Sequence, residues 1–316
     1  MTKISKSDIK DMLAKVEHLV LTVHVSPDGD AIGSMAALYE YLIGQGKNVT
    51  MVVDDEVPSK FRFLSVMAHI KDVSQEASIL DGLEQPDLVV VLDASTRERI
   101  GKVAAWCQTP ILNIDHHISN SQFADYLYLD AEAAATGEIL ADLFMTWQAK
   151  VTPAMANALY LAMGTDSGFF KYSNTTAHTL QMGAYCLEKG AQPDLVSEQA
   201  EEITVKALEG MKEALQTVTF HKNGHVACMS VPYALMEKVQ GQTDGFIEWI
   251  RHVDTVDIAI LLKEKEPGQT RVSLRSKGAD VNRVAAVFGG GGHIRAAGCS
   301  ISLPLEEAKK KLLEAI

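Results

Sequence analysis

Four segments of the chain carry aspartate and histidine where an apolar run or a helix is expected to end. Side chains of these types are costly to bury unless another group satisfies them. No Lys or Arg is spaced to pair with them, so they would repel one another at a shared site unless cations lay between them. The segments are "VHVSPDGDAIGS" with His24, Asp28 and Asp30, "VVVLDAS" with Asp93, "ILNIDHH" with Asp115, His116 and His117, and "AMGTDSGFF" with Asp166.

Each of these residues also has an ordinary structural interpretation. His24 could be a satisfied core histidine, and Asp28, Asp30 and Asp93 could cap helices or form turns. Asp166 could simply end a helix. Such explanations are hard to apply to the whole set at once, because so many carboxylates and imidazoles converge, and the sequence therefore predicts a functional site.

Two metal ions are the chemistry that this donor set suits. The spacing His24-x3-Asp28-x-Asp30 lets the imidazole and the first carboxylate face one ion while the second carboxylate faces another, and Asp93 on a neighbouring strand could bridge both. Two ions about 3.5 to 4 Å apart clamp a phosphate and activate water for in-line attack. Carboxylates with a few imidazoles and no thiolate suit Mn²⁺ or Mg²⁺ better than a structural zinc. We expect two Mn²⁺ ions, with Mg²⁺ or Co²⁺ as alternatives.

The elements that must position these residues form an α/β domain. Near-continuous apolar strands separated by helices indicate a doubly wound parallel sheet, whose ligands bind at the carboxyl ends of the strands. We expect strands at 18–25, 48–53, 86–95 and 110–117, and helices at 31–47 and 97–107.

The rest of the chain divides into a helical part, a linker and a smaller domain. Residues 135–190 show helical spacing and complete a first domain over 1–190. Residues 191–215 are polar, include Pro193 and resemble a linker leading into a helix. Strands and a hairpin-like "KEPGQT" turn predict a mixed α+β domain over 216–316.

The charge and residue composition of the chain limit the kinds of partner that we expect it to bind. The chain has 316 residues and a net charge of -12, which argues against binding of long nucleic acid, although a short anionic ligand held by local cations stays open. The four cysteines show no metal-binding or disulfide spacing. No signal-like or membrane-spanning apolar run is present, so we expect a cytoplasmic protein with no membrane partner.

The motifs "VSPDGDAIGS", "VVVLDAS", "NIDHH" and "GTDSGFF" resemble, in order and separation, those of the DHH phosphoesterase superfamily over about the first 190 residues. The resemblance implies that His117 meets the substrate phosphate and that Asp115 supports the histidines. It implies metal ligation by His24 and Asp28 on one ion, by Asp30, His116 and Asp166 on the other, and by Asp93 on both.

A glycine run in the second domain is the other candidate binding feature. Glycine backbone N–H groups can approach a phosphate closely, and arginine offers it a planar fork. The segment "TRVSLRSKGADVNRVAAVFGGGGHIRAAG" resembles the DHH-associated C-terminal domain, which implies substrate binding by Arg275, Ser276, Gly290, Gly291, Gly292 and His293. Arg295, Asp54 and Asp55 receive no role from the sequence.

Over its whole length the chain resembles the NrnA-type group of the superfamily. That resemblance implies an Mn²⁺-dependent hydrolase that degrades very short oligoribonucleotides and removes the 3'-phosphate from 3'-phosphoadenosine 5'-phosphate (pAp). A phosphodiesterase of cyclic or linear dinucleotide messengers is the alternative, and a non-catalytic nucleotide-binding protein is a third hypothesis, disfavoured because all six ligand positions are present. The sequence leaves open the substrate preference and the polarity of digestion. It also leaves open the oligomeric state, for which a homodimer is one possibility.

Overall fold

The computed structural model describes residues 1–316, which form two compact units, Met1–Glu202 and Ile203–Ile316. The division falls inside the segment 191–215, where the sequence suggests a linker. Most of that segment is helical, with α8 (Pro193–Glu201) ending the first unit and α9 (Val205–Leu215) opening the second. No helix has the length and apolar character needed to cross a membrane.

The first unit is built on a seven-stranded sheet in which every pair of neighbouring strands is parallel. Its order is β1-β7-β6-β5-β2-β3-β4, so β6, β5 and β2 are adjacent at the centre. The strands are β1 (Thr2–Lys3), β2 (His18–Thr22), β3 (Asn48–Val53), β4 (Ile70–Asp72), β5 (Leu88–Leu92), β6 (Ile111–Asp115) and β7 (Tyr126–Leu129).

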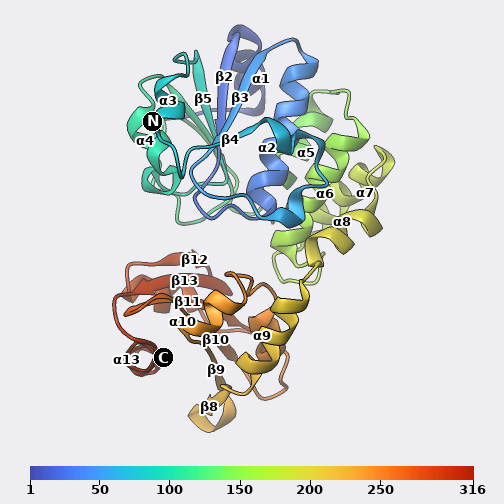
Figure 1. Ribbon diagram of the computed structural model, residues 1–316. Helices are drawn as coiled ribbons and strands as arrows, with labels where there is room; N and C mark the ends of the chain where they lie inside the picture. Colours follow the sequence, from blue (N-terminus) through green and yellow to red (C-terminus); the bar gives the residue numbers. More distant parts are fainter. The chain divides into compact units, whose positions relative to one another are not determined.

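Helices cover both faces of this sheet, as Figure 1 shows, which confirms the doubly wound α/β fold. The larger core lies under α2, α5 and α6, and the smaller one under α3 and α4. The helices are α1 (Lys6–Lys15), α2 (Gly29–Gly44), α3 (Ser78–Asp81), α4 (Lys102–Trp106), α5 (Thr136–Thr146), α6 (Pro153–Ser167) and α7 (Ala177–Glu188), with 3-10 turns η1 (Ser59–Phe61), η2 (Ser65–His69) and η3 (Arg97–Ile100).

Small residues let α2 and α6 pack closely together. A Cβ on Gly29 would lie 2.3 Å from a methyl carbon of Thr165, and one on Gly33 would lie 2.4 Å from the carbonyl oxygen of Ala158. Both positions therefore exclude any larger residue. This close approach brings the C-terminal end of α6, which carries Asp166, beside the N-terminal end of α2, which carries Asp30.

The elements differ from the sequence expectations mainly at their ends. The first strand stops at Thr22 rather than continuing to 25, and the following helix begins at Gly29, before the expected 31. The expected helix 97–107 is broken into η3 and α4 at Gly101, whose φ of +56° leaves the helical region. Three short strands, β1, β4 and β7, were not expected because they are too brief to show a pattern.

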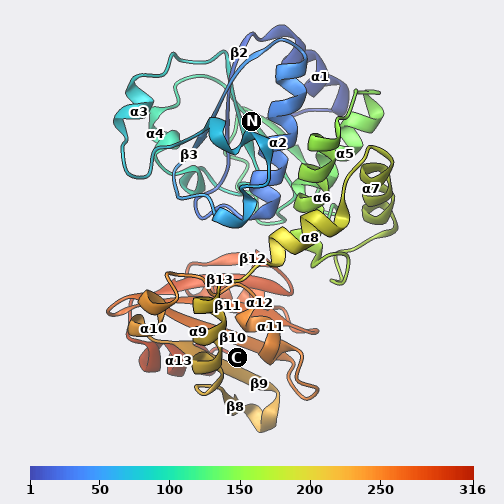
Figure 2. The same cartoon turned by 45° about the vertical axis from the view of Figure 1, so that its right-hand side comes forward.

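The second unit has a six-stranded sheet of order β12-β13-β11-β10-β9-β8. In Figure 2, β12 and β8 mark its two edges. The expected hairpin is formed by β10 and β11, which pair antiparallel around Pro267 and Gly268. The elements are β8 (Thr219–His221), η4 (Lys222–Gly224), β9 (Val226–Val231), α10 (Tyr233–Lys238), α11 (Phe246–Arg251), β10 (Ile258–Glu266), β11 (Gln269–Ser276), α12 (Val281–Val287), β12 (Gly291–His293), β13 (Ala296–Ile301) and α13 (Leu305–Glu314).

Candidate metal centre

The sheet order explains how distant segments of the chain meet. Because β2, β5 and β6 are adjacent and parallel, their carboxyl ends lie at one edge of the sheet, where His24, Asp93 and His116 follow them. Asp93 has a left-handed φ of 56°, a conformation that aspartate tolerates better than most residues and that recurs at functional sites. The order of the strands therefore brings His24, Asp93 and His116 together, although they are distant in the sequence.

One group of potential ligands comprises His24, Asp28 and Asp93. The His24 Nε2 atom lies 3.8 Å from Asp28 Oδ2 and 3.3 Å from Asp93 Oδ2. Its other nitrogen, Nδ1, lies 2.8 Å from the Val25 carbonyl oxygen. A histidine that donates Nδ1–H to a carbonyl turns the lone pair of Nε2 toward the carboxylates, which is the tautomer that ligates a metal.

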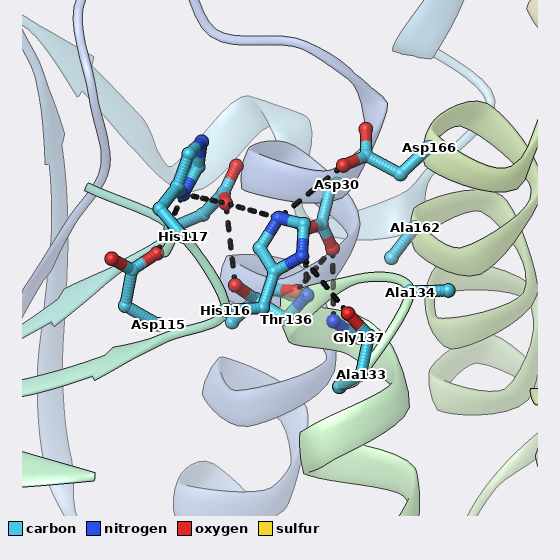
Figure 3. A network of polar contacts seen from close by, with 12 residues as sticks. Asp30, Asp115, His116, His117, Ala133, Ala134, Thr136, Gly137, Ala162 and Asp166 are labelled. Atoms are coloured by element: carbon cyan, nitrogen blue, oxygen red, sulfur yellow. Dashed lines mark hydrogen bonds and ion pairs between the residues drawn. The ribbon is translucent and has the colours of Figure 1, made fainter. Parts of the chain in front are cut away.

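A second group comprises Asp30, His116 and Asp166. Figure 3 shows the His116 ring beside both carboxylates, with its Nε2 atom 3.7 Å from Asp30 Oδ2 and 3.3 Å from Asp166 Oδ2. Its Nδ1 atom lies 3.2 Å from the Ala133 carbonyl oxygen, so this ring repeats the arrangement of His24. Both histidines thus direct Nε2 toward carboxylate oxygens.

Asp93 contacts both groups through different oxygens. Its Oδ2 faces His24, whereas its Oδ1 lies 3.4 Å from His116 Nε2 and 3.5 Å from His117 Nδ1. The Thr136 hydroxyl donates to the same Oδ1 at 3.3 Å. A carboxylate that reaches two groups in this way has the geometry needed to bridge two cations.

The start of α5 holds Asp30 in place, which the sequence reading missed. The backbone N–H groups of Thr136 and Gly137 donate to its two oxygens at 2.7 and 2.8 Å, and the Ser34 hydroxyl donates to Oδ1 at 3.1 Å. The first N–H groups of a helix have no partner within the helix and carry partial positive charge, so they stabilise a carboxylate. Nothing in the sequence links these two residues to Asp30, which lies more than 100 positions earlier in the chain.

His117 belongs to a separate network that anchors the loop after β6. Its Nδ1 atom lies 2.7 Å from Asp115 Oδ1, and Asp115 Oδ2 accepts from Asn120 Nδ2 at 2.6 Å. Asn120 also donates to Asn113 Oδ1 at 2.8 Å, and Asn113 donates to the Ala94 carbonyl beyond Asp93. The two asparagines, which sequence reasoning passed over, tie the ends of β5 and β6 together.

The electrostatics of the site are those of carboxylates crowded around imidazoles. Burial alone would lower the pKa of His24, but its interactions with the carboxylates of Asp28 and Asp93 raise it to about 10. Burial is likewise outweighed at His116, whose pKa Asp166 and Asp93 raise well above the ordinary value. Burial and the nearby Asp93 charge raise the pKa of Asp30 well above its usual range. The site therefore calls for positive charge, as protons or as metal ions.

Asp54 and Asp55, which received no role from the sequence, follow β3 and contact neighbouring loops. Asp55 Oδ2 accepts hydrogen bonds from Ser26 N at 2.9 Å and Ser26 Oγ at 3.1 Å. Asp54 accepts from the backbone N of Lys102 at 2.7 Å and from its Nζ at 3.0 Å. Asp55 therefore touches the loop between His24 and Asp28.

The candidate binding residues of the second unit are divided between packing and exposed positions. Arg275 is half-buried on β11, with its Nε atom 3.8 Å from Glu248 Oε1. Ser276 is buried and its hydroxyl donates to the Ala279 carbonyl, so its side chain points into the unit rather than toward a ligand. Gly290 and Gly292 are required by the close packing of the β12–β13 hairpin, where a Cβ would lie 2.1 and 2.6 Å from backbone oxygens, whereas Gly291 is exposed.

Comparisons with known proteins agree with this architecture. The model of the DHH family, N-terminal domain, matches residues 18–163, and that of the DHHA1 domain matches residues 233–316. The crystal structure of an exopolyphosphatase-related protein from Bacteroides fragilis is similar, with a TM-score of 0.88 and 26% identity, covering 98% of this chain and 94% of that one.

Two relatives carry the same name, bifunctional oligoribonuclease and PAP phosphatase NrnA. The relative from Thermus thermophilus is 30% identical, over 98% of this chain and 92% of its own length. The relative from Bacillus subtilis is 26% identical, over 94% of this chain and 93% of its own length. With both domains matched and near-complete coverage at this identity, the chain belongs to the DHH family and carries a DHHA1 domain.

Proposed function

We propose that this chain is a metal-dependent phosphoesterase that hydrolyses very short oligoribonucleotides and removes the 3'-phosphate from pAp. The observation that carries the proposal is the pair of ligand groups that share Asp93, one with His24 and the other with His116. The names of the relatives support the substrate class and favour it over cyclic or linear dinucleotide messengers.

The residues present fit two divalent cations. Both histidines that would ligate have Nδ1 against a backbone carbonyl and Nε2 toward carboxylates. Ligation would come from His24, Asp28 and Asp93 on one side and from Asp30, His116, Asp166 and Asp93 on the other. The oxygen-rich set without thiolate suits Mn²⁺, with Mg²⁺ or Co²⁺ as substitutes. When bound, the two ions would polarise the phosphoryl oxygens and acidify the attacking water.

His117 is proposed to meet the scissile phosphate. Burial alone would lower the pKa of His117, but the hydrogen bond with Asp115 and the charge of Asp93 raise it. This shift favours the protonated ring, in which Nδ1–H would donate to Asp115 and Nε2–H would donate to a phosphoryl oxygen of the substrate. Asp115 would hold the ring in this orientation without touching the substrate.

In the second unit, we propose that Arg275, Gly291 and His293 bind the part of the substrate that is not cleaved. Arg275 provides a planar fork for phosphate, and its Nε atom forms a long ion pair of 3.8 Å with Glu248 Oε1. Arg275→Ala should raise the KM for pAp about 10-fold with little change in kcat, since it removes charge-assisted hydrogen bonds made before and during the reaction. An unchanged KM would refute its placement.

A turnover panel with Mn²⁺ tests the function. The substrates are pAp, the dinucleotide pApA, a pentanucleotide, a long RNA, cyclic di-AMP and pyrophosphate. We expect pAp and the two short RNAs to be hydrolysed fastest, and chelation of the metal to stop turnover. A preference for pyrophosphate, the long RNA or cyclic di-AMP would contradict the proposed substrate class.

A further inference from the structure

The loop between His24 and Asp28 is held by groups outside it. Ser26 in this loop has a left-handed φ of 56°, which costs free energy for a residue with a side chain. The loop lies between β2 and α2 and belongs to neither element. Its shape decides whether His24 and Asp28 can face the same cation, so the contacts that maintain it bear directly on the metal centre.

Asp55 forms hydrogen bonds with this loop at Ser26. Its Oδ2 atom accepts from both the backbone N–H and the hydroxyl of that residue, while its Oδ1 accepts from Glu56 N at 2.9 Å. Both carboxylate oxygens are thus engaged by hydrogen bonds of ordinary length, 2.9 to 3.1 Å. Bonds from a charged acceptor to backbone N–H groups are about twice as strong as neutral ones, which suits a contact that must hold a strained residue.

The Ser26 N–H belongs to the same peptide group as the Val25 carbonyl. That group is planar and rigid, and in its trans form the N–H and C=O point in opposite directions. One end donates to Asp55 and the other accepts from His24 Nδ1 at 2.8 Å. The peptide therefore transmits any change at Asp55 directly to the orientation of the His24 ring.

We propose that Asp55 is a positioning residue that fixes the His24 imidazole through the Val25–Ser26 peptide, so that His24 Nε2 and the Asp28 carboxylate hold one cation together. In many metal sites a carboxylate accepts a hydrogen bond directly from the ligating histidine. Here the Val25–Ser26 peptide group lies between the His24 ring and the Asp55 carboxylate. A carboxylate on the N–H also polarises the peptide and strengthens its carbonyl as an acceptor, which raises the basicity of the ligating nitrogen. The inference rests on the proposed metal-dependent function.

A second contact supports the same loop from the neighbouring turn. The Val25 N–H donates to the Arg99 carbonyl at 2.7 Å, and Asp54 secures Lys102 three residues further on. Asp54 acts on the loop only through this longer route. We therefore assign the direct effect on His24 to Asp55.

The test compares Mn²⁺ binding by wild type, Asp55→Ala and Asp55→Asn, measured by calorimetry. Asp55→Ala should weaken one of two bound ions about 10- to 100-fold and leave the other unchanged. Asp55→Asn keeps an acceptor oxygen for the Ser26 N–H and should recover most of that affinity. This rescue separates positioning by a hydrogen-bond acceptor from a general need for negative charge near the site.

Asp87→Ala provides a matched control in the same sheet. Its Oδ2 atom also accepts two backbone hydrogen bonds, from Glu17 N and His18 N, both at 2.9 Å, but at the start of β2 rather than after its end. We expect this variant to lower the unfolding temperature while both Mn²⁺ affinities stay at the wild-type value. Equal loss of Mn²⁺ affinity in Asp87→Ala and Asp55→Ala would overturn the proposal.

The outcomes separate the inference from the proposed function. If wild type binds two Mn²⁺ ions and Asp55→Ala binds them equally well, the inference alone fails. If Asp55→Ala loses one ion selectively but wild type hydrolyses neither pAp nor short RNA, the substrate assignment fails and the inference stands. A wild-type protein that binds no Mn²⁺ contradicts both.

Discussion

The two ligand groups of the metal centre are held in different ways. Asp30 and His116 are almost completely buried, and helices α2 and α5 supply three hydrogen bonds to Asp30. Asp28, by contrast, has a side chain that is 53% exposed, and the buried His24 is oriented through the partly buried loop after β2 rather than by a helix. We call these the helix-held group (Asp30, His116 and Asp166) and the loop-held group (His24 and Asp28).

The difference predicts unequal metal sites. The helix-held group is preorganised by packing, so a cation there needs little rearrangement of the protein and should bind tightly. The loop-held group depends on a strained residue and a few hydrogen bonds, so its cation should bind more weakly. Since Asp93 reaches both groups, it is the residue that couples them.

Asp93→Ala should have the largest effect, because it removes a ligand from both groups at once. We expect kcat on pAp with saturating Mn²⁺ to fall by at least about 1000-fold, in line with the loss of preorganised electrostatic stabilisation. Circular dichroism should show an intact fold. Near wild-type turnover would remove the basis for treating the two groups as one centre.

Asp30→Ala should lower the free energy of unfolding more than Asp28→Ala, which would distinguish the helix-held group from the loop-held group. Loss of the Asp30 carboxylate leaves the buried N–H groups of Thr136 and Gly137 without an acceptor, which should cost about 3 kcal/mol of unfolding free energy. Loss of Asp28 removes only a helix N-cap, at about 1 kcal/mol. Urea denaturation of the metal-free proteins measures both values without the contribution of bound metal, and equal losses would argue against the distinction between the groups.

His117→Ala should leave both groups intact while impairing the reaction. Its Nδ1 atom is engaged by Asp115, and the ring is proposed to meet phosphate rather than metal. We expect about a 100-fold fall in kcat with Mn²⁺ stoichiometry unchanged. Loss of a bound ion in this variant would instead make His117 a ligand, and the division between the two adjacent histidines would have to be reversed.

Proton release on metal binding should reveal the charge state of the loop-held group. With a pKa of about 10, His24 holds a proton at pH 7 in the metal-free protein, and a metal must displace it. Calorimetric titration of Mn²⁺ at pH 7 should therefore give heats that depend on the ionisation enthalpy of the buffer, corresponding to about one proton or more. Binding should weaken as the pH falls. Buffer-independent heats would show that His24 is already neutral.

The sequence predicted the sheet and the residues at its edge well, for a physical reason. Buried parallel strands read as apolar runs, and polar residues directly after them must lie at the carboxyl edge. His24, Asp93 and His116 were found in this way. Asp166 was singled out at the end of a predicted helix, and its place beside the other ligands depends on how closely α2 and α6 pack. The resemblance to a known family then assigned different roles to His116 and His117.

Other contributions could not be predicted because they come from backbone groups or from pairs distant in the chain. The N–H groups of Thr136 and Gly137 are backbone groups, which no residue type reveals. The hydrogen bond from Asn120 to Asp115 depends on the conformation of the loop after β6, which the sequence does not show. Ser276 is another example, since its place in a motif gave no hint that its hydroxyl donates to the Ala279 carbonyl. The role proposed for Asp55 likewise depends on its hydrogen bond to the Val25–Ser26 peptide group, which only the structure shows.

Electron paramagnetic resonance of the Mn²⁺-loaded protein tests the central claim most directly. Two ions about 4 Å apart on a shared carboxylate should be exchange-coupled, so their spectrum should differ from that of isolated Mn²⁺. We predict a coupled spectrum at two ions per chain in the wild type, and an isolated-ion spectrum in Asp93→Ala. A wild-type spectrum of isolated ions at every stoichiometry would contradict the dinuclear centre.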